Sequence, residues 1–283
     1  MTPAIGPGPE AKSAPASSDL PKRLGSALVL AAIGLAAVVA SPRTFAALIA
    51  GAGIVVAWEW SRLVRGRDID VAMAMQAGAV AAIAFLVTLG RPELAGIVLV
   101  LALAGIAFAT SGEARLWSVF GLPYAALPAW ALLLLRSDSS HGITAVLYVI
   151  TIAILTDTAS YAGGRLLGGT KLAPRISPQK TWSGLIVGLA VPTLAGFAFA
   201  SALDTSPWWL AFVSLLLAGA CQIGDLTESA IKRRFGVKDM SGIIPGHGGV
   251  LDRIDGLLFA ALAAAAIVAF RGMTNPGQAL LIW

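Results

Sequence analysis

The chain has 283 residues, of which 57% are hydrophobic and only 12% are charged. Soluble domains carry roughly 25% charged residues, so this composition excludes an ordinary soluble protein and indicates that lipid surrounds much of the chain. The net charge of +5 could indicate an anionic partner, but the basic residues are spread over loops between apolar segments, and we expect no nucleic-acid partner. The single cysteine, Cys221, excludes an intramolecular disulfide and is expected to be a free thiol packed among helices.

Residues 1–22 are rich in Pro, Ala, Gly and Ser and predict a disordered tail. The rest of the chain contains apolar segments of roughly 17–25 residues, the length that crosses a bilayer core about 30 Å thick. Nine such segments are found, at about 24–41, 43–62, 71–89, 93–110, 116–135, 142–164, 182–203, 207–226 and 251–270. No water reaches the bilayer core, so each segment should satisfy its own backbone hydrogen bonds as a helix. The predicted fold is therefore all-α, a polytopic transmembrane protein of about nine spans.

The basic residues predict the orientation of these spans. Lys22 and Arg23 precede the first segment as in a signal peptide, but this segment leads directly into a second one and is interpreted as a span. With the N-terminus in the cytoplasm, all lysines and arginines lie on the cytoplasmic side except Arg43, Arg91, Arg136 and Arg271. Cytoplasmic loops of membrane proteins carry such an excess, so the bias supports an odd number of spans.

The chain divides into two regions after the tail. Residues 23–140 hold the first five spans, which are nearly free of ionisable groups apart from Glu59 and are predicted to be a transmembrane scaffold. Residues 141–283 hold the last four spans and their polar loops, and we predict that this region is catalytic. A small-residue face at Gly184-x-x-x-Gly188 permits close helix packing, and a homodimer is left open.

Carboxylates and basic residues gather at the cytoplasmic ends of spans six, eight and nine. The carboxylates are Asp157, Asp225, Glu228, Asp252 and Asp255, and the basic residues are Lys171, Lys180, Lys232, Arg233, Lys238 and His247. Charged residues within spans are costly, at roughly 2.5–3.5 kcal/mol each, so such a cluster indicates a function. Mg²⁺ takes one or two carboxylates together with phosphate oxygens, and lysine or arginine neutralises the remaining anionic charge. The cluster therefore predicts a metal–phosphate site.

A glycine-rich loop, residues 245–249, leads directly into span nine. Glycines let backbone N–H groups approach an anion closely, and a helix N-terminus favours negative charge. Asp252 and Asp255 are three residues apart and share one helix face, where they could hold one or two metal ions.

Each of these features alone has an ordinary explanation. A glycine-rich turn is often only a connection, and aspartates in a first turn complement the helix dipole. His247 alone could be a hydrogen-bonded loop residue, Asp157 a helix-end residue with a water partner, and Lys232-Arg233-Arg234 an anchor in lipid headgroups. The prediction rests on their joint occurrence.

The stretch from Ser229 to Asp255 resembles the signature of the phosphatidate cytidylyltransferase (CDP-diacylglycerol synthase) family. The matching positions are Ser229, Lys232-Arg233, Lys238-Asp239, Pro245-x-His247-Gly248-Gly249 and Asp252-Arg253-x-Asp255. Segments around Asp157, at 171–181 and at 224–229 agree with the family as well, so the resemblance covers about residues 150–270.

The resemblance implies that CTP and phosphatidate react to give CDP-diacylglycerol and pyrophosphate at the inner (plasma) membrane, with a cytoplasmic active site. It implies the catalytic residues Asp225, Lys232, Arg233, Lys238, Asp239, His247, Asp252, Arg253 and Asp255. It implies the substrate-binding residues Asp157, Lys171, Ser177, Lys180, Ser229, Gly246, Gly248 and Gly249. The implied cofactor is Mg²⁺, as one or two ions on Asp225, Asp252 and Asp255, with Asp157 as a further carboxylate. The implied partners are CTP, phosphatidic acid in the bilayer and membrane lipids.

Two alternatives stay open at this point. Asp252-x-x-Asp255-Gly256 resembles the opening of the CDP-alcohol phosphotransferase motif, but no further aspartate follows it. A transporter with an intramembrane carboxylate site would carry charge near the middle of the bilayer and broken helices in paired halves, whereas the charges here lie at one edge and in one half of the chain.

Overall fold

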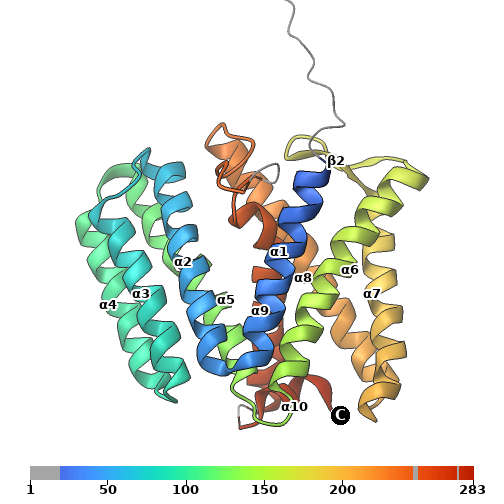
Figure 1. Cartoon of the computed structure of the whole chain (residues 1–283). Coiled ribbons are helices and arrows are strands. Elements are labelled where there is room, and N and C mark those ends of the chain that lie inside the picture. Colours follow the sequence, from blue (N-terminus) through green and yellow to red (C-terminus); the bar gives the residue numbers. More distant parts are fainter. Residues whose placement is uncertain (1–19, 245–247, 273) are drawn as a thin grey trace, which may run out of the picture.

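The structure is a computed structural model that describes residues 20–244, 248–272 and 274–283 (Figure 1). Most of the predicted N-terminal tail lies outside the described residues, and so do Gly246 and His247. The helices are α1 (Leu20–Ala40), α2 (Pro42–Arg65), α3 (Val71–Thr88), α4 (Pro92–Ala109), α5 (Gly112–Arg136), α6 (Gly142–Leu167), α7 (Trp182–Leu203), α8 (Pro207–Arg234), α9 (Leu251–Arg271) and α10 (Pro276–Leu281). A hairpin of β1 (Lys171–Ala173) and β2 (Ser177–Thr181) joins α6 to α7.

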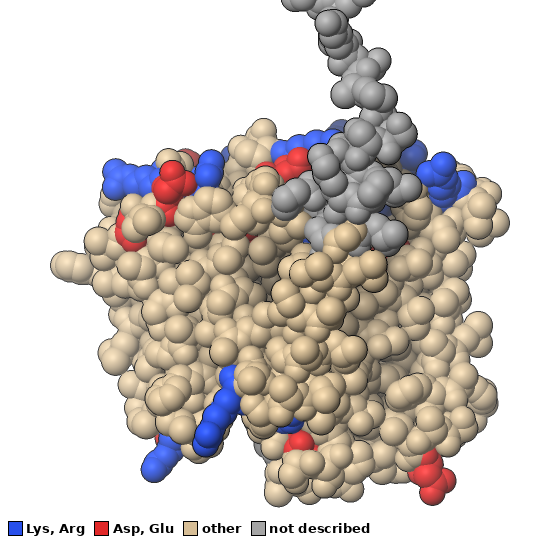
Figure 2. All heavy atoms as spheres, in the orientation of Figure 1, with Lys and Arg blue, Asp and Glu red and all other residues tan. Residues whose placement is uncertain are grey.

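The predicted all-α transmembrane fold is confirmed. Each of the nine predicted spans corresponds to one helix, α1 to α9 in order, within the part of the chain that is described. Eight of them, α2 to α9, are long and apolar enough to cross a membrane, and among the described side chains α1 contributes the shorter apolar stretch Leu28–Ala40. Figure 2 shows a broad belt without charged residues on the face in view, with charged side chains gathered mainly at the upper edge and a few at the lower edge.

Local sequence signals explain where several helices begin. Ser41 and Thr44 form a capping box ahead of α2, and Asp70 caps α3 by accepting a hydrogen bond from the Met73 N–H. Thr181 caps α7 in the same way, through the Gly184 N–H. Proline stands in the first turn of α2, α4, α8 and α10, where its missing N–H would have no partner in any case.

Helix α9 lies between two groups of helices (Figure 1). It packs against α5 on one side and against α6 and α8 on the other. Helices α2 to α5 form the first group, and α6 to α8 with the hairpin form the second. Helix α9 of the predicted catalytic region is thus in contact with α5 of the predicted scaffold.

Helices α6 and α7 approach each other closely through glycines. A Cβ atom on Gly184 would lie 2.8 Å from the backbone oxygen of Ser160, and one on Gly163 would lie 2.6 Å from Cβ of Val187. The small-residue face at Gly184 and Gly188 is therefore used within the chain, because both positions pack on α6.

Two elements were not predicted from the sequence. The hairpin pairs β1 and β2 antiparallel, with Lys171 opposite Thr181 and Ala173 opposite Ser177. Helix α10 follows α9 at the far edge, where Arg271 donates to the backbone oxygens of Ala279 and Ile282. Both elements are short, and contacts with other parts of the chain hold them.

Candidate active site

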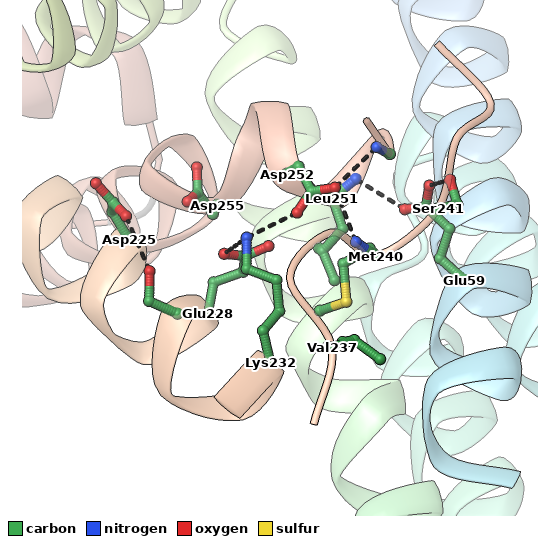
Figure 3. Close-up of polar contacts among 12 residues, drawn as sticks. Glu59, Asp225, Glu228, Lys232, Val237, Met240, Ser241, Leu251, Asp252 and Asp255 are labelled. Atoms are coloured by element: carbon green, nitrogen blue, oxygen red, sulfur yellow. Dashed lines mark hydrogen bonds and ion pairs between the residues drawn. The ribbon is translucent and has the colours of Figure 1, made fainter. Parts of the chain in front are cut away.

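The predicted site residues gather at one end of α6, α8 and α9, together with the hairpin, and they form two adjoining groups. The first lines an open pocket between α6, the hairpin, α7 and α8. The second is a buried ion-pair network between α8 and α9. Figure 3 shows Asp225 and Asp255 at one end of this region, Lys232 in the middle, and Asp252 and Glu59 at the other end.

The pocket has a volume of about 670 Å³. Five predicted residues line it, namely Asp157, Lys171, Ser177, Lys180 and Asp225. Further polar groups on its wall come from Ser160, Arg165 and Gln222, with Ser160 and Gln222 hydrogen-bonded to each other. Because the hairpin supplies both lysines and Ser177, the pocket depends on an element that the sequence had suggested only as a loop.

Three carboxylates from three helices lie within electrostatic range of one another in and beside the pocket. They are Asp157 on α6, Asp225 on α8 and Asp255 on α9. Lys180 forms an ion pair with Asp225, with Nζ 2.6 Å from Oδ2, and Ser229 Oγ lies 3.5 Å from the other oxygen. Carboxylates so placed repel one another unless cations balance them, so the pocket is suited to a bound cation or a basic side chain.

Lys232 is the centre of the buried network. Its Nζ lies 2.5 Å from Oε2 of Glu228 and 2.8 Å from Oδ1 of Asp252. The side chains of Glu228 and Asp252 are 1% and 4% exposed, so this lysine is what balances two carboxylates removed from water.

Asp252 also fixes the loop before α9. Its Oδ2 accepts hydrogen bonds from the Met240 and Gly249 N–H groups, at 2.9 and 2.8 Å. The Gly249 N–H, which we predicted to bind phosphate, is therefore occupied by a carboxylate in this arrangement. Gly248 has φ +81°, the left-handed conformation that favours glycine. The predicted roles of Gly246 and His247 fall outside the described residues.

The remaining predicted residues lie around these groups. Arg233 is exposed and donates to the backbone oxygens of Ile176 and Val237, which ties α8 to the turn of the hairpin. Lys238 and Asp239 are exposed on the segment after α8, and Arg253 is exposed on the first turn of α9. The structure thus brings Lys171 and Lys180 together with the three aspartates of the pocket region. It leaves Lys238 and Asp239 at the surface.

Two residues of the predicted scaffold reach the site, and neither was predicted from the sequence to be a site residue. Glu59 on α2 accepts hydrogen bonds from the segment before α9. Tyr124 on α5 is buried, and its hydroxyl lies near the carboxyl groups of Glu228 and Asp255. A lone carboxylate in an apolar span is a signal that could have identified Glu59, whereas a tyrosine in a span carries no comparable signal.

The donor set fits a loosely held divalent cation. Within the described ranges, no three His, Cys, Asp or Glu side chains form a ready-made metal site. Mg²⁺ is usually held by one or two carboxylates, with phosphate oxygens and water completing its shell. Asp225 and Asp255 meet that requirement, and buried Glu228 Oε1 has no hydrogen-bond partner within the part of the chain described. Asp252 is less free, because its two oxygens already accept three donors.

Fold and site together define a polytopic membrane protein with a pocket at one edge of its helix bundle, lined by both basic and carboxylate side chains. Residues 21–271 match the model of the cytidylyltransferase family. The chain therefore belongs to the cytidylyltransferase family and is a nucleotidyltransferase.

Similar proteins support the same assignment. The chain is 39% identical to phosphatidate cytidylyltransferases of Brucella suis and Brucella melitensis over 247 residues, which cover 86% of this chain and 91% of each relative. It is 45% identical to the phosphatidate cytidylyltransferase of Staphylococcus haemolyticus over 126 residues, 44% of this chain and 47% of the relative. The resemblance stated from residues 229–255 is confirmed, and the phosphotransferase and transporter alternatives are set aside.

Proposed function

We propose that the protein transfers the cytidylyl group of CTP to phosphatidate, giving CDP-diacylglycerol and pyrophosphate in phospholipid biosynthesis. The observation that carries this proposal is the similarity to phosphatidate cytidylyltransferases across nine-tenths of their length. The pocket supports it independently, because it combines basic side chains for phosphate with carboxylates for a metal ion.

The transfer requires little covalent chemistry from the protein. A phosphate oxygen of phosphatidate attacks the α-phosphorus of CTP, the bond from that phosphorus to the oxygen bridging to the β-phosphorus breaks, and pyrophosphate leaves. The attacking oxygen is already anionic near neutral pH, so no general base is needed. Both reactants are anions, and catalysis by such sites consists mainly of positioning and charge neutralisation.

The residues of the pocket can supply both effects. Lys171 and Lys180 on the hairpin, and Arg165 at the end of α6, face the space where phosphates would lie. Lys180 would exchange its ion pair with Asp225 for a substrate phosphate. Lys232 holds the ends of α8 and α9 in register through Glu228 and Asp252.

A divalent cation, proposed as Mg²⁺, fits Asp225 and Asp255, and when bound it would supply positive charge to the phosphate oxygens. Asp252 and Asp157 stay predicted further carboxylates of this site. Asp252 would take part only if Lys232 released one of its oxygens.

The surroundings of the pocket suit a lipid substrate. Tyr161 of the pocket wall and nearby Leu166 and Trp182 are 67%, 82% and 51% exposed on the helix surfaces, where acyl chains could enter from the bilayer. We propose that this edge faces the cytoplasm at the inner membrane, because basic residues are concentrated there and CTP is soluble. A homodimer stays an open prediction.

The test is release of pyrophosphate by the purified protein in detergent with CTP, Mg²⁺ and phosphatidic acid. We expect pyrophosphate and CDP-diacylglycerol in equal amounts, and none when either substrate is omitted. Asp225→Asn and Asp255→Asn should each lower the rate by about 10²–10³-fold, because the loss of a metal carboxylate removes several kcal/mol of charge stabilisation.

Asp68→Asn is the matched control, because Asp68 is an exposed carboxylate on the same edge, outside the pocket. Its rate should equal that of the wild type. If the wild-type protein released no pyrophosphate, the proposed function would be wrong. If Asp225→Asn and Asp255→Asn both kept full activity, the assignment of these two residues to the metal ion would be wrong.

A further inference from the structure

Glu59 holds the segment that leads into α9, although it lies on α2 in the predicted scaffold. The residue is fully buried. Its Oε1 accepts hydrogen bonds from Ser241 Oγ at 2.6 Å and from the Val250 N–H at 2.8 Å, and its Oε2 accepts one from the Leu251 N–H at 2.8 Å. Figure 3 shows the Glu59 carboxylate facing Ser241 and Leu251. One side chain therefore joins both ends of the loop before α9.

These hydrogen bonds supply what the start of α9 lacks. The first N–H groups of any helix have no partner within the helix, and Val250, at the N-cap position of α9, has no side-chain cap of its own. Glu59 satisfies the Val250 and Leu251 N–H groups from another helix, while Asp252 satisfies that of Gly249. A carboxylate at this position is also favoured by the positive end of the helix dipole.

The Glu59 carboxylate also explains why residue 249, in the stretch that resembles the family signature, is a glycine. A Cβ atom on Gly249 would overlap Oε1 of Glu59 and would lie 3.1 Å from Cβ of Met240. At Gly248 the positive φ itself favours glycine, and a Cβ there would also lie 2.9 Å from Oδ2 of Asp252. Gly249 has no positive φ, so it is the Glu59 side chain on α2, and not the backbone conformation, that favours glycine at this position.

We infer that Glu59 is a positioning residue for the cytidylyl transfer, and that Gly249 is the position shaped to receive it. This inference rests on the proposed function. Glu59 and Asp252 together hold Met240, Ser241, Gly249, Val250 and Leu251 at the entrance of α9. Asp252 and Asp255 follow directly on the first turns of α9, so the direction in which α9 enters the site determines where these carboxylates lie. Glu59 does not reach the pocket itself.

The experiment compares Glu59→Gln with Glu113→Gln in the full-length protein. Glu113 is an exposed carboxylate in the first turn of α5, at the same edge. The amide keeps the shape of Glu59 but replaces one acceptor oxygen by a donor that faces an N–H group. We expect kcat to fall about 100-fold, the size of effect that a misplacement of about 1 Å produces, with KM for CTP changed less. Amide hydrogen exchange should rise in the 248–252 segment only.

A second pair of variants tests Gly249 and guards against misfolding of the first. Gly249→Ala alone should lower kcat strongly, whereas Gly249→Ala added to Glu59→Ala should lower it little further, because the methyl group then occupies space that the carboxylate has left. Ser241→Ala removes one of the three donors and should give a smaller loss than Glu59→Gln.

Unchanged kcat in Glu59→Gln, or additive effects of Glu59→Ala and Gly249→Ala, would overturn the inference. So would a loss of activity that only follows the loss of folded protein in a melting curve. Hydrogen exchange keeps the two proposals separate. If the wild-type protein had no cytidylyltransferase activity, the proposed function would fail. The amide exchange of residues 248–252, compared between the wild type and Glu59→Gln, would still report whether Glu59 holds the loop.

Discussion

At the scale of single residues, Lys232 on α8 links its own helix to α9 through a buried pair of carboxylates. Its ammonium group contacts Glu228 and Asp252 at 2.5 and 2.8 Å, and the lysine side chain is only 13% exposed. Removing one partner of a buried ionic group costs about 3–5 kcal/mol, because the other charge is left without compensation. The positive-inside rule alone would assign Lys232 a place among lipid headgroups, which its burial contradicts.

We predict that Lys232→Met destabilises the protein by about 3–5 kcal/mol, since two buried carboxylates would then face each other unbalanced. The measurement is the thermal melting temperature in detergent. Lys232→Met combined with Glu228→Gln should recover part of the loss, because only one carboxylate, that of Asp252, then lacks a balancing cation, and two N–H groups still donate to it.

Lys238→Met is the control for this change, since Lys238 is exposed on the following segment. Its melting temperature should stay close to that of the wild type, because an ordinary surface substitution changes the free energy of unfolding by no more than about 0.5 kcal/mol. Equal melting of the Lys232→Met and Lys238→Met proteins would show that the network does not hold the two helices.

At the scale of elements, the pocket depends on how closely α6 and α7 pack. Both helices contribute to its wall, and Gly163, Gly184 and Gly188 allow their backbones to approach. The hairpin between them is a two-stranded unit that would be only marginally stable alone. Here Thr181 ends β2 and caps α7, and Arg233 binds the oxygen of Ile176 in the turn.

We predict that Gly163→Ala destabilises the protein by about 1–3 kcal/mol, the usual cost of overpacking. Its Cβ would lie 2.6 Å from Cβ of Val187, an atom fixed to the backbone of α7. The melting temperature in detergent measures the effect. Gly219→Ala on α8 is the matched control, because nothing lies within 4 Å of a Cβ at that position; a control that melted as early as Gly163→Ala would contradict the packing argument.

At the scale of the whole molecule, the edge opposite the site is held together by a carboxylate in the turn between α5 and α6. Asp138 accepts hydrogen bonds from the N–H groups of Ser140 and His141, at 2.9 and 2.8 Å, and from that of Gln278 in α10 at 3.0 Å. Burial alone would raise the pKa of Asp138, but the N–H groups of His141, Gln278 and Ser140 outweigh it and hold this pKa below its usual value.

We predict a corresponding loss of stability in acid. A carboxyl group whose pKa is lowered by folding stabilises the protein fully above its unfolded pKa, about 3.9, and this contribution disappears as the pH falls through the folded pKa. Melting temperatures measured from pH 7 down to pH 3 should therefore fall more steeply for the wild type than for Asp138→Asn.

Asp204→Asn is the control for the acid measurement, because Asp204 is exposed at the end of α7, and asparagine tolerates its left-handed conformation (φ 50°). This variant should follow the wild-type curve. Parallel curves for the wild type and Asp138→Asn would show that the turn contributes nothing specific to stability in acid.

The spans and the chemistry could be predicted from the sequence because both depend on local composition. The length of an apolar segment is set by the thickness of the bilayer, so the predicted segment at 182–203 coincides with α7. Asp225, Asp252 and Asp255 stood out because carboxylates are costly inside spans. The prediction that residues 23–140 are a transmembrane scaffold did not anticipate the hydrogen bond between Glu59 and Ser241.

The sequence by itself determined a helical membrane protein of about nine spans with its polar residues in the last third, because hydropathy and charge are properties of each segment alone. Only the tertiary structure decided which groups meet. It placed Lys232 between two carboxylates, gave the Gly249 N–H to Asp252, and brought Glu59 on α2 against the start of α9. Such contacts depend on the packing of helices far apart in the chain, which no local pattern encodes.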